Sequence, residues 1–208
     1  MAIAAVTVSA ADKVITLPKH DLSKVKTTVA QTYNRRQSTR EFAGQDLNKQ
    51  DLSNLLWAAN GYNRPETMKR TAPSAMNRQE VTVYAVIKEG IYEYNPKDES
   101  LILKAEGDYR NLVAGRQDFV KSAPVSILLS ADVSKLGDAK NIHAQYMASV
   151  DVGIVTENIC LYCAAANLAV VPRASMDTNA LKKLLNLDDN QLLIMNTPVG
   201  YFVSSKAK

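Results

Sequence analysis

The sequence predicts an α+β fold in which helices flank a central sheet. The strand-like segments cluster in the middle of the chain, at residues 81–87, 91–94, 101–103 and 124–129, and do not alternate strictly with helices. One long helical pattern, residues 141–167, contains no proline. The 208 residues suffice for one domain with a full core, and no repeat, low-complexity stretch or internal linker divides them.

The composition is that of an ordinary globular protein, with 46% hydrophobic and 22% charged residues. The net charge is +4, and the 25 lysines and arginines are spread among 21 acidic residues. A nucleic-acid partner is therefore not predicted. No stretch approaches the ~20 apolar residues that a membrane-spanning helix requires, so no membrane partner is predicted either.

Residues 1–22 are predicted to form a leader-like segment or an arm, ahead of a single domain at residues 23–208. Small apolar residues run from Ala2 to Ala11, and Val8-Ser9-Ala10 has the small side chains of a signal-peptidase site. However, no basic residues precede this run, and the run is short. Two interpretations stay open: an exported, periplasmic protein whose true start lies upstream, or a cytoplasmic protein with a loose N-terminal tail.

The first elements are predicted from caps and helical spacing. Residues 23–33 are predicted to form a helix, followed by an extended segment at residues 38–42. Asn48 is a good N-cap for a second helix, because the apolar residues from Leu52 to Ala59 follow helical spacing. Gly61 marks the end of that helix.

The middle of the chain is predicted to be mainly extended. Val81–Ile87 is β-branched and aromatic, as strands are, and the sequence Asn95-Pro96-Lys97-Asp98 favours a hairpin turn between two further strands. The remaining predictions here are a polar loop at 64–77, a modest helix at 108–117 and a buried strand at 124–129.

The long helical pattern at residues 141–167 carries apolar residues on more than one face. Such a helix must be buried on most sides, which in a chain of this size indicates that a second subunit covers part of it. Its Cys160 and Cys163 form a C-x-x-C, but no second pair and no nearby histidine accompany them, so they are predicted to be buried core residues. No metal site is predicted, since His20 and His143 are far apart in sequence.

The last predicted elements are shorter. A strand begins at Val170-Val171, and Asp177 is expected to cap a helix that runs to Leu185. Two extended segments, at residues 192–195 and 199–203, close the chain.

The basic segment Arg35-Arg36-Gln37-Ser38-Thr39-Arg40 is the first candidate site. It places three guanidiniums and two hydroxyls within six residues, where a helical pattern ends. Arginine forks form strong charge-assisted bonds to phosphate oxygens, so the segment suits a dianionic phosphate. A short basic run alone is more often solvated surface. Three later segments give it weight: Pro73-Ser74-Ala75-Met76-Asn77-Arg78-Gln79, Val171-Pro172-Arg173-Ala174-Ser175 and Lys206-Ala207-Lys208.

In this order, the four segments resemble the nitroreductase family of FMN-dependent oxidoreductases, from about residue 28 to the C-terminus. The resemblance implies a central, mainly antiparallel sheet and a homodimer with FMN at the subunit interface. It also implies that the long helix lies at that interface. The residue pattern of the segments slightly favours the branch of this family that is related to azoline dehydrogenases.

The resemblance also assigns roles to individual residues. Arg36 and Arg40 would hold the flavin phosphate and ribityl end, assisted by Ser38 and Gln37, and Lys206 and Lys208 would complete the phosphate cage. The loop with Pro73, Ser74, Ala75 and Asn77 would come from the other subunit and pack on the isoalloxazine. Pro172, Ala174 and Ser175 would present a backbone N–H to the flavin N5, although Ala174-Ser175 stands where relatives often have Glu-Gly.

No catalytic side chain is predicted, because the flavin carries the chemistry in such enzymes. The resemblance implies a ping-pong reaction in which NAD(P)H is the electron donor and an electrophile such as a nitroaromatic or quinone is the acceptor. Nothing resembles the G-x-G-x-x-G of a Rossmann nucleotide site. Arg173 and Arg78 are candidate substrate contacts, with a plain surface arginine as the alternative for each.

Three other functions stay open beside this one, and one of them is a phosphate-ligand binder without flavin. The chain could be a partner-dependent flavin dehydrogenase of a peptide-derived heterocycle. It could also be a flavin-binding or storage protein without turnover. The electron acceptor and the choice between NADH and NADPH are not predicted.

Overall fold

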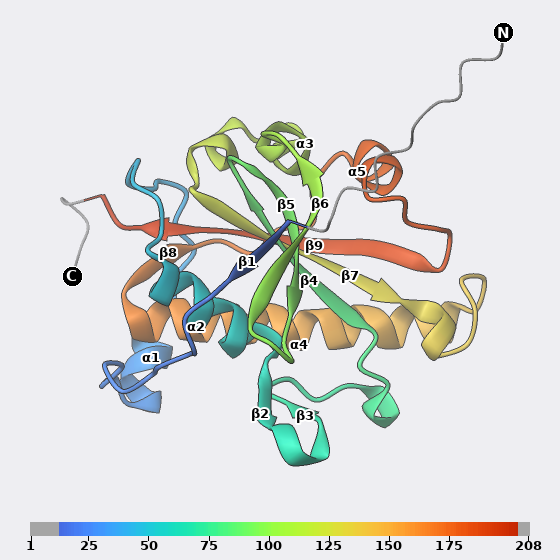
Figure 1. Cartoon of the computed structure of the whole chain (residues 1–208), viewed down its shortest axis with the longest axis horizontal. Helices are drawn as coiled ribbons and strands as arrows, with labels where there is room; N and C mark the ends of the chain where they lie inside the picture. The colour runs from blue at the N-terminus through green and yellow to red at the C-terminus, as the bar shows by residue number, and fades with distance from the viewer. Residues whose placement is uncertain (1–12, 204–208) are drawn as a thin grey trace, which may run out of the picture.

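The computed structural model describes residues 13–203, which form a seven-stranded sheet with helices on both faces (Figure 1). Every strand pair in this sheet is antiparallel. The strand order is β1-β6-β5-β4-β7-β9-β8. The strands are β1 (Val14–Thr16), β4 (Val81–Ile87), β5 (Gly90–Asn95), β6 (Ser100–Glu106), β7 (Val125–Asp132), β8 (Leu168–Val170) and β9 (Gln191–Tyr201).

Helices and short turns make up the rest of the fold. The α-helices are α1 (Val29–Arg35), α2 (Lys49–Asn60), α3 (Arg110–Ala114), α4 (Ile142–Ala166) and α5 (Thr178–Leu184). A small hairpin pairs β2 (Tyr62–Arg64) with β3 (Lys69–Arg70). The 3₁₀ turns are η1 (Pro65–Thr67), η2 (Ala75–Asn77), η3 (Asp118–Ser122) and η4 (Val133–Lys135).

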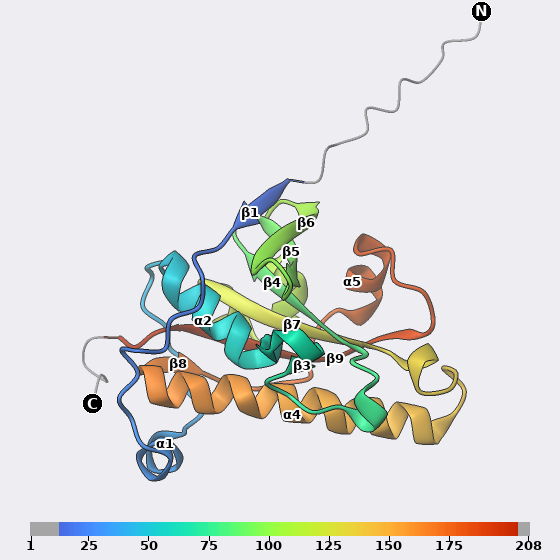
Figure 2. The ribbon, with the colours of Figure 1, turned by 60° about the horizontal axis from the view of Figure 1, so that its bottom comes forward.

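The two faces of the sheet bury two separate cores. In β4, Val83 and Ala85 join the core beneath α2 and α4, while Tyr84 and Val86 join the core with α3 and α5. This follows from the two-residue period of a strand, which sends successive side chains to opposite faces. Figure 2 shows α2 and α4 together on one side of the sheet and α5 on the other. The predicted α+β class is confirmed.

Most predicted elements are present, with changed boundaries. Asn48 and Asp177 cap α2 and α5 through side-chain acceptors, as expected, and Asn141 caps α4 in the same way. The predicted start of the first helix, at residue 23, was wrong. The side chain of Thr28 caps α1, and the helix begins at Val29. Residues 38–42 form no strand, and the two extended segments expected at the end of the chain are one strand, β9.

The described part of the predicted arm, residues 13–22, packs onto the domain. Strand β1 pairs with β6, and Leu17 is only 5% exposed within the α2–α4 core. Residues 1–12, including Val8-Ser9-Ala10, lie outside the described residues, so the leader interpretation and the compartment stay predictions.

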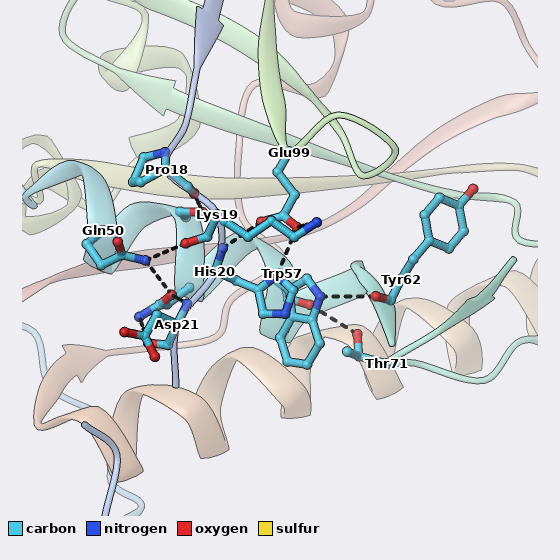
Figure 3. A network of polar contacts seen from close by, with 11 residues as sticks. Pro18, Lys19, His20, Asp21, Gln50, Trp57, Tyr62, Thr71 and Glu99 are labelled. Atoms are coloured by element: carbon cyan, nitrogen blue, oxygen red, sulfur yellow. Dashed lines mark hydrogen bonds and ion pairs between the residues drawn. The ribbon is translucent and has the colours of Figure 1, made fainter. Parts of the chain in front are cut away.

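A polar network fastens this arm to α2 and to the β5–β6 turn (Figure 3). The backbone N–H of His20 donates to Glu99 Oε2 at 2.7 Å, and His20 Nδ1 lies 2.8 Å from Glu99 Oε1. The His20 ring also stacks on Trp57, with the ring centroids 4.0 Å apart. Burial alone would raise the pKa of Glu99, yet its pKa is lowered, because the His20 groups and Lys19 favour the carboxylate. The network therefore anchors the arm.

Helix α4 is the longest element and packs one side against the sheet and α2. Val152, Val155 and Ile159 are almost fully buried, whereas Ile142 and Tyr146 are 77% and 64% exposed. The expectation about membrane spans needs correction, since α4 is long and apolar enough to cross a membrane. Core helices commonly pass that test, and half of the window that meets it is buried inside this fold.

Cys160 and Cys163 are free and buried in α4, as predicted. Burial raises the pKa of the Cys160 thiol to about 11 and that of Cys163 well above its ordinary value. Because the thiolate is the reactive form, these raised pKa values disfavour reaction of either side chain at neutral pH.

Candidate functional site

The basic segment Arg36–Arg40 leaves the C-terminal end of α1 and runs beside β8. The backbone N–H of Arg36 closes the helix by donating to Thr32 O at 2.9 Å, and the N–H of Thr39 donates to Val170 O at 2.8 Å. Figure 2 shows α1 and β8 near the same end of α4. The candidate phosphate-binding residues Arg36, Gln37, Ser38 and Arg40 are all exposed.

Among residues 13–203, neither Arg36 nor Arg40 takes part in a salt bridge. Their guanidiniums are therefore available to an anion from outside the chain. A cavity of about 250 Å³ opens next to them, lined by Arg35, Gln37, Ala164 and Phe202 among others. The chemistry of this donor set fits a phosphate group.

The segment after β8 lies next to the basic segment, as the resemblance requires. Arg40 and Arg173 both approach the ring of Phe119, each with its guanidinium carbon 6.0 Å from the ring centroid. Ala174 and Ser175 are exposed, and within the described chain no backbone hydrogen bond uses their N–H groups. Two free donors therefore lie near the candidate phosphate site.

The loop Pro73–Gln79 lies elsewhere, against the middle of α4. The N–H of Ala75 donates to Asp151 Oδ2 at 2.7 Å, whereas the cavity beside Gln37 reaches Ala164. Thirteen residues separate Asp151 from Ala164, which is about 20 Å along a helix. A single chain therefore does not bring this loop to the basic segment.

The same loop holds an unusual backbone. Met76, Asn77 and Gln79 have φ values of 51°, 55° and 50°, in the left-handed region that non-glycine residues rarely adopt. Such conformations persist where surrounding contacts hold them and are common at ligand sites. Met76 is 73% exposed, and Arg78 is exposed as well. The loop therefore presents Met76, Asn77 and Arg78 outward from the fold.

Arg173 is not a surface arginine, because it is only 8% exposed. The alternative of a plain surface residue was therefore wrong at this position. Arg173 Nη1 donates to Val113 O and to Asn196 Oδ1, each at 2.7 Å, and its Nη2 donates to Ala114 O at 2.7 Å. Its Nε donates to Gln117 Oε1 at 2.9 Å. Since four of its five N–H bonds are used inside the fold, the geometry disfavours a direct substrate contact.

Glu80 and Asp151 form a buried acid pair that no pattern in the sequence predicts. Glu80 is 0% exposed and Asp151 is 3% exposed. Both carboxyl oxygens of Glu80 lack a donor in the described structure. Burial, and after it the neighbouring carboxyl of Asp151, raises the pKa of Glu80 to about 7. The pair lies directly behind the Pro73–Gln79 loop.

Lys206 and Lys208 lie outside the described residues, so their role in a phosphate cage stays a prediction. Within the described chain, no group of three histidine, cysteine or acidic side chains could hold a metal ion.

Comparisons with known proteins decide the family. Residues 33–201 match the sequence profile described as the Nitroreductase family. The chain belongs to the nitroreductase family.

Individual members of the nitroreductase family agree with this assignment. A protein of Ralstonia eutropha JMP134 proposed to be a nitroreductase shares 33% identity and has a TM-score of 0.85, with 95% of this chain and 93% of that chain covered. MJ1384 of Methanocaldococcus jannaschii, also proposed to be a nitroreductase, is 28% identical over 175 residues, which cover 80% of this chain and 87% of the relative.

The fold extends beyond simple nitroreductases. A chain of the Escherichia coli microcin synthetase McbBCD complex has a TM-score of 0.73 at 16% identity, with 90% of this chain and 75% of that chain covered. At that identity the likeness concerns the fold alone. Nitroreductase-family proteins are generally flavin-dependent, and the chain is accordingly an oxidoreductase of flavin type.

Proposed function

We propose that this protein is an FMN-dependent oxidoreductase that takes electrons from NAD(P)H and delivers them to an electrophile such as a nitroaromatic or quinone. The observation that carries the proposal is that the segment with Arg36 and Arg40, which form no salt bridge among residues 13–203, runs beside β8, and that the free N–H groups of Ala174 and Ser175 follow that strand. One end of that arrangement suits a phosphate, and the other suits the polar edge of a ring.

The basic segment would bind the phosphate end of FMN. Arg36 and Arg40 supply positive charge and planar donor forks, while Ser38 and Gln37 supply neutral hydrogen-bonding groups for the ribityl chain. Lys206 and Lys208 would add two further cations. An exposed anion site of this kind depends on several charges together, because each one is partly screened by solvent.

The ring end of the site would need a second copy of the chain. Asn77 and the rest of the Pro73–Gln79 loop lie about 20 Å along α4 from the basic segment, so they reach a shared flavin only across a subunit interface. The proposed assembly is therefore a homodimer with FMN between its subunits. The exposed apolar residues of α4 support this arrangement.

The protein's contribution to the reaction is position and electrostatics. Bound FMN would supply the two-electron chemistry, and no side chain of this chain need exchange a proton with substrate. A main-chain N–H of Ala174 or Ser175 would orient the ring edge that reacts. The nicotinamide donor and the acceptor would occupy the same open face in turn, which makes the kinetics ping-pong.

An anaerobic absorption spectrum tests the proposal. The purified protein should show a flavin band after FMN is added, and NADH or NADPH should bleach that band without oxygen. Bound FMN that does not bleach would favour a partner-dependent dehydrogenase of a peptide-derived heterocycle, or a storage protein. A protein that binds no FMN would contradict the proposal.

Arg36→Ala tests the placement of the phosphate. Removing one charge-assisted contact, worth about 1.5–3 kcal/mol, should weaken FMN binding about 10- to 100-fold. The measurement is the FMN dissociation constant, obtained from flavin fluorescence. Lys104→Ala, which removes a cation from β6, is the matched control and should bind FMN as the wild type does. Unchanged affinity in Arg36→Ala would show that the phosphate binds elsewhere.

A further inference from the structure

The buried guanidinium of Arg173 is held entirely by neutral acceptors. Two of these are the main-chain carbonyls of Val113 and Ala114, in the last turn of α3, where carbonyl groups have no partner within the helix. The others are the side-chain amides of Gln117 and Asn196. Arg173 thus ties the segment after β8 to the end of α3.

No described carboxylate neutralises this charge. None of the salt bridges among residues 13–203 includes Arg173, and burial is the one cause that lowers its pKa. Arginine nonetheless stays protonated in proteins. Since buried charges are normally paired, an unpaired one is costly and calls for an explanation.

Asn196 fixes the same segment from the other side. Its backbone exchanges two hydrogen bonds with Arg173, at 2.9 Å and 2.7 Å, and its Nδ2 donates to Ser175 O at 3.1 Å. Asn196 is 0% exposed and lies in the sheet strand β9. The backbone from Arg173 to Ser175 is therefore held rigidly, while the N–H groups of Ala174 and Ser175 stay free.

We propose that Arg173 is a positioning residue for the flavin. It would fix the Ala174–Ser175 backbone that orients the reacting ring edge, and its unpaired positive charge would favour reduced FMN over oxidised FMN. The inference rests on the proposed function. Its electrostatic part follows from charge alone, because reduced flavin carries more negative charge at neutral pH than oxidised flavin.

Three substitutions separate charge from position. Arg173→Met removes both the charge and the four hydrogen bonds. Arg173→Lys keeps the charge but cannot reproduce the fork. Asn196→Asp leaves the guanidinium in place and puts a carboxylate oxygen where the amide oxygen now lies 2.7 Å from Nη1, so it cancels the charge, but it also loses the Nδ2 hydrogen bond to Ser175 O.

The measurement is the midpoint potential of FMN bound to the full chain, from anaerobic titration against a reference dye. Arg173→Met and Asn196→Asp should each lower the preference for reduced over oxidised FMN about tenfold, which is about 30 mV for a two-electron couple. Arg173→Lys should keep a potential close to that of the wild type and bind oxidised FMN several-fold more weakly.

Lys183→Met is the charge-matched control, because Lys183 is exposed on α5 and its removal should leave the potential unchanged. If Arg173→Met fails to fold, Asn196→Asp decides by comparison with Asn196→Ser, which loses the hydrogen bond to Ser175 O without adding a charge. A wild-type potential in folded Asn196→Asp, with FMN bound, would overturn the inference while leaving the proposed function intact. A wild-type protein that binds no FMN would instead overturn the proposed function and, with it, this inference.

Discussion

At the scale of single residues, the surroundings of Glu80 strongly raise the pKa of its carboxyl group. Its carboxyl group is fully buried and faces Asp151, whose own carboxylate accepts a hydrogen bond from Ala75 in the loop of left-handed residues. Among residues 13–203, Lys135 is the one cation that favours the charged form of Glu80. Burial and the neighbouring acid outweigh it, so that the pKa rises from 4.5 to about 7.

This raised pKa predicts that stability falls as pH rises. The folded state holds the Glu80 proton up to about pH 7, whereas the unfolded chain releases it near pH 4.5. The folded state therefore binds more protons in that window, and its stabilisation is complete below pH 4.5 and lost as pH passes 7. We expect a loss on the order of 1–3 kcal/mol between pH 5 and 8, measured by urea unfolding.

Glu80→Gln should remove this pH dependence, because an amide mimics the protonated acid in shape and keeps a donor for Asp151. The matched control is Glu66→Gln, an exposed position on η1, which should keep the wild-type slope. Parallel stability curves for the wild type and Glu80→Gln would contradict the assignment of the proton to Glu80.

At the scale of elements, α1 sets the direction in which the basic segment leaves the fold. Thr28 and Gln31 form a capping box, with the N–H of Gln31 donating to Thr28 Oγ1 at 3.2 Å and the N–H of Thr28 donating to Gln31 Oε1 at 2.9 Å. The last helical hydrogen bond, from Arg36 N–H to Thr32 O, fixes the first residue of the candidate phosphate site.

Thr28→Ala should therefore loosen α1 locally. Loss of such an N-cap costs about 1 kcal/mol, so the amides of Thr32 and Arg36 should exchange with solvent roughly fivefold faster. Hydrogen exchange followed by NMR measures this directly. Asp177→Ala, which removes the cap of α5, should speed exchange there and leave α1 unchanged. Unaltered exchange at Arg36 would show that other contacts hold the helix.

Elements with local signals were predictable, and those set by distant partners were not. Asn48, Asn141 and Asp177 carry their capping chemistry in the sequence itself. By contrast, β9 looked interrupted because Pro198 has no N–H to give, yet its carbonyl accepts the N–H of Val171 and the strand continues.

The candidate site likewise contains features that the sequence predicts and features that only the folded structure shows. The basic segment and the three later segments were visible as residue types in order. The partners of Arg173 were not, because they are carbonyls and amides 23 to 60 positions away in the sequence. The Glu80–Asp151 pair likewise exists only after folding, since a lone glutamate after a loop carries no signal of burial.

At the scale of the whole molecule, the two halves of the candidate site lie about 20 Å apart along α4. Exposed apolar side chains lie in a row along one face of α4, where Ile142, Tyr146 and Val150 are spaced four residues apart. Met76 of the Pro73–Gln79 loop is exposed beside this helix. Apolar side chains gathered in this way favour an interface.

Tyr146→Glu should therefore disrupt both assembly and cofactor binding. A carboxylate buried without a partner is strongly unfavourable, so the proposed dimer should dissociate at micromolar concentration. Because each flavin site would need the Pro73–Gln79 loop of the other subunit, FMN affinity should fall at least ~10-fold along with dimerisation. Sedimentation velocity and FMN fluorescence, measured on the same samples, test the two effects together.

The matched control is Val14→Glu, since Val14 is also an exposed apolar residue, at 53%, but lies on the edge strand β1. This variant should stay dimeric and bind FMN normally. A Tyr146→Glu protein that remains dimeric would show that α4 is not the interface. A monomeric Tyr146→Glu protein with wild-type FMN affinity would show instead that one chain completes the site without the loop of a second subunit.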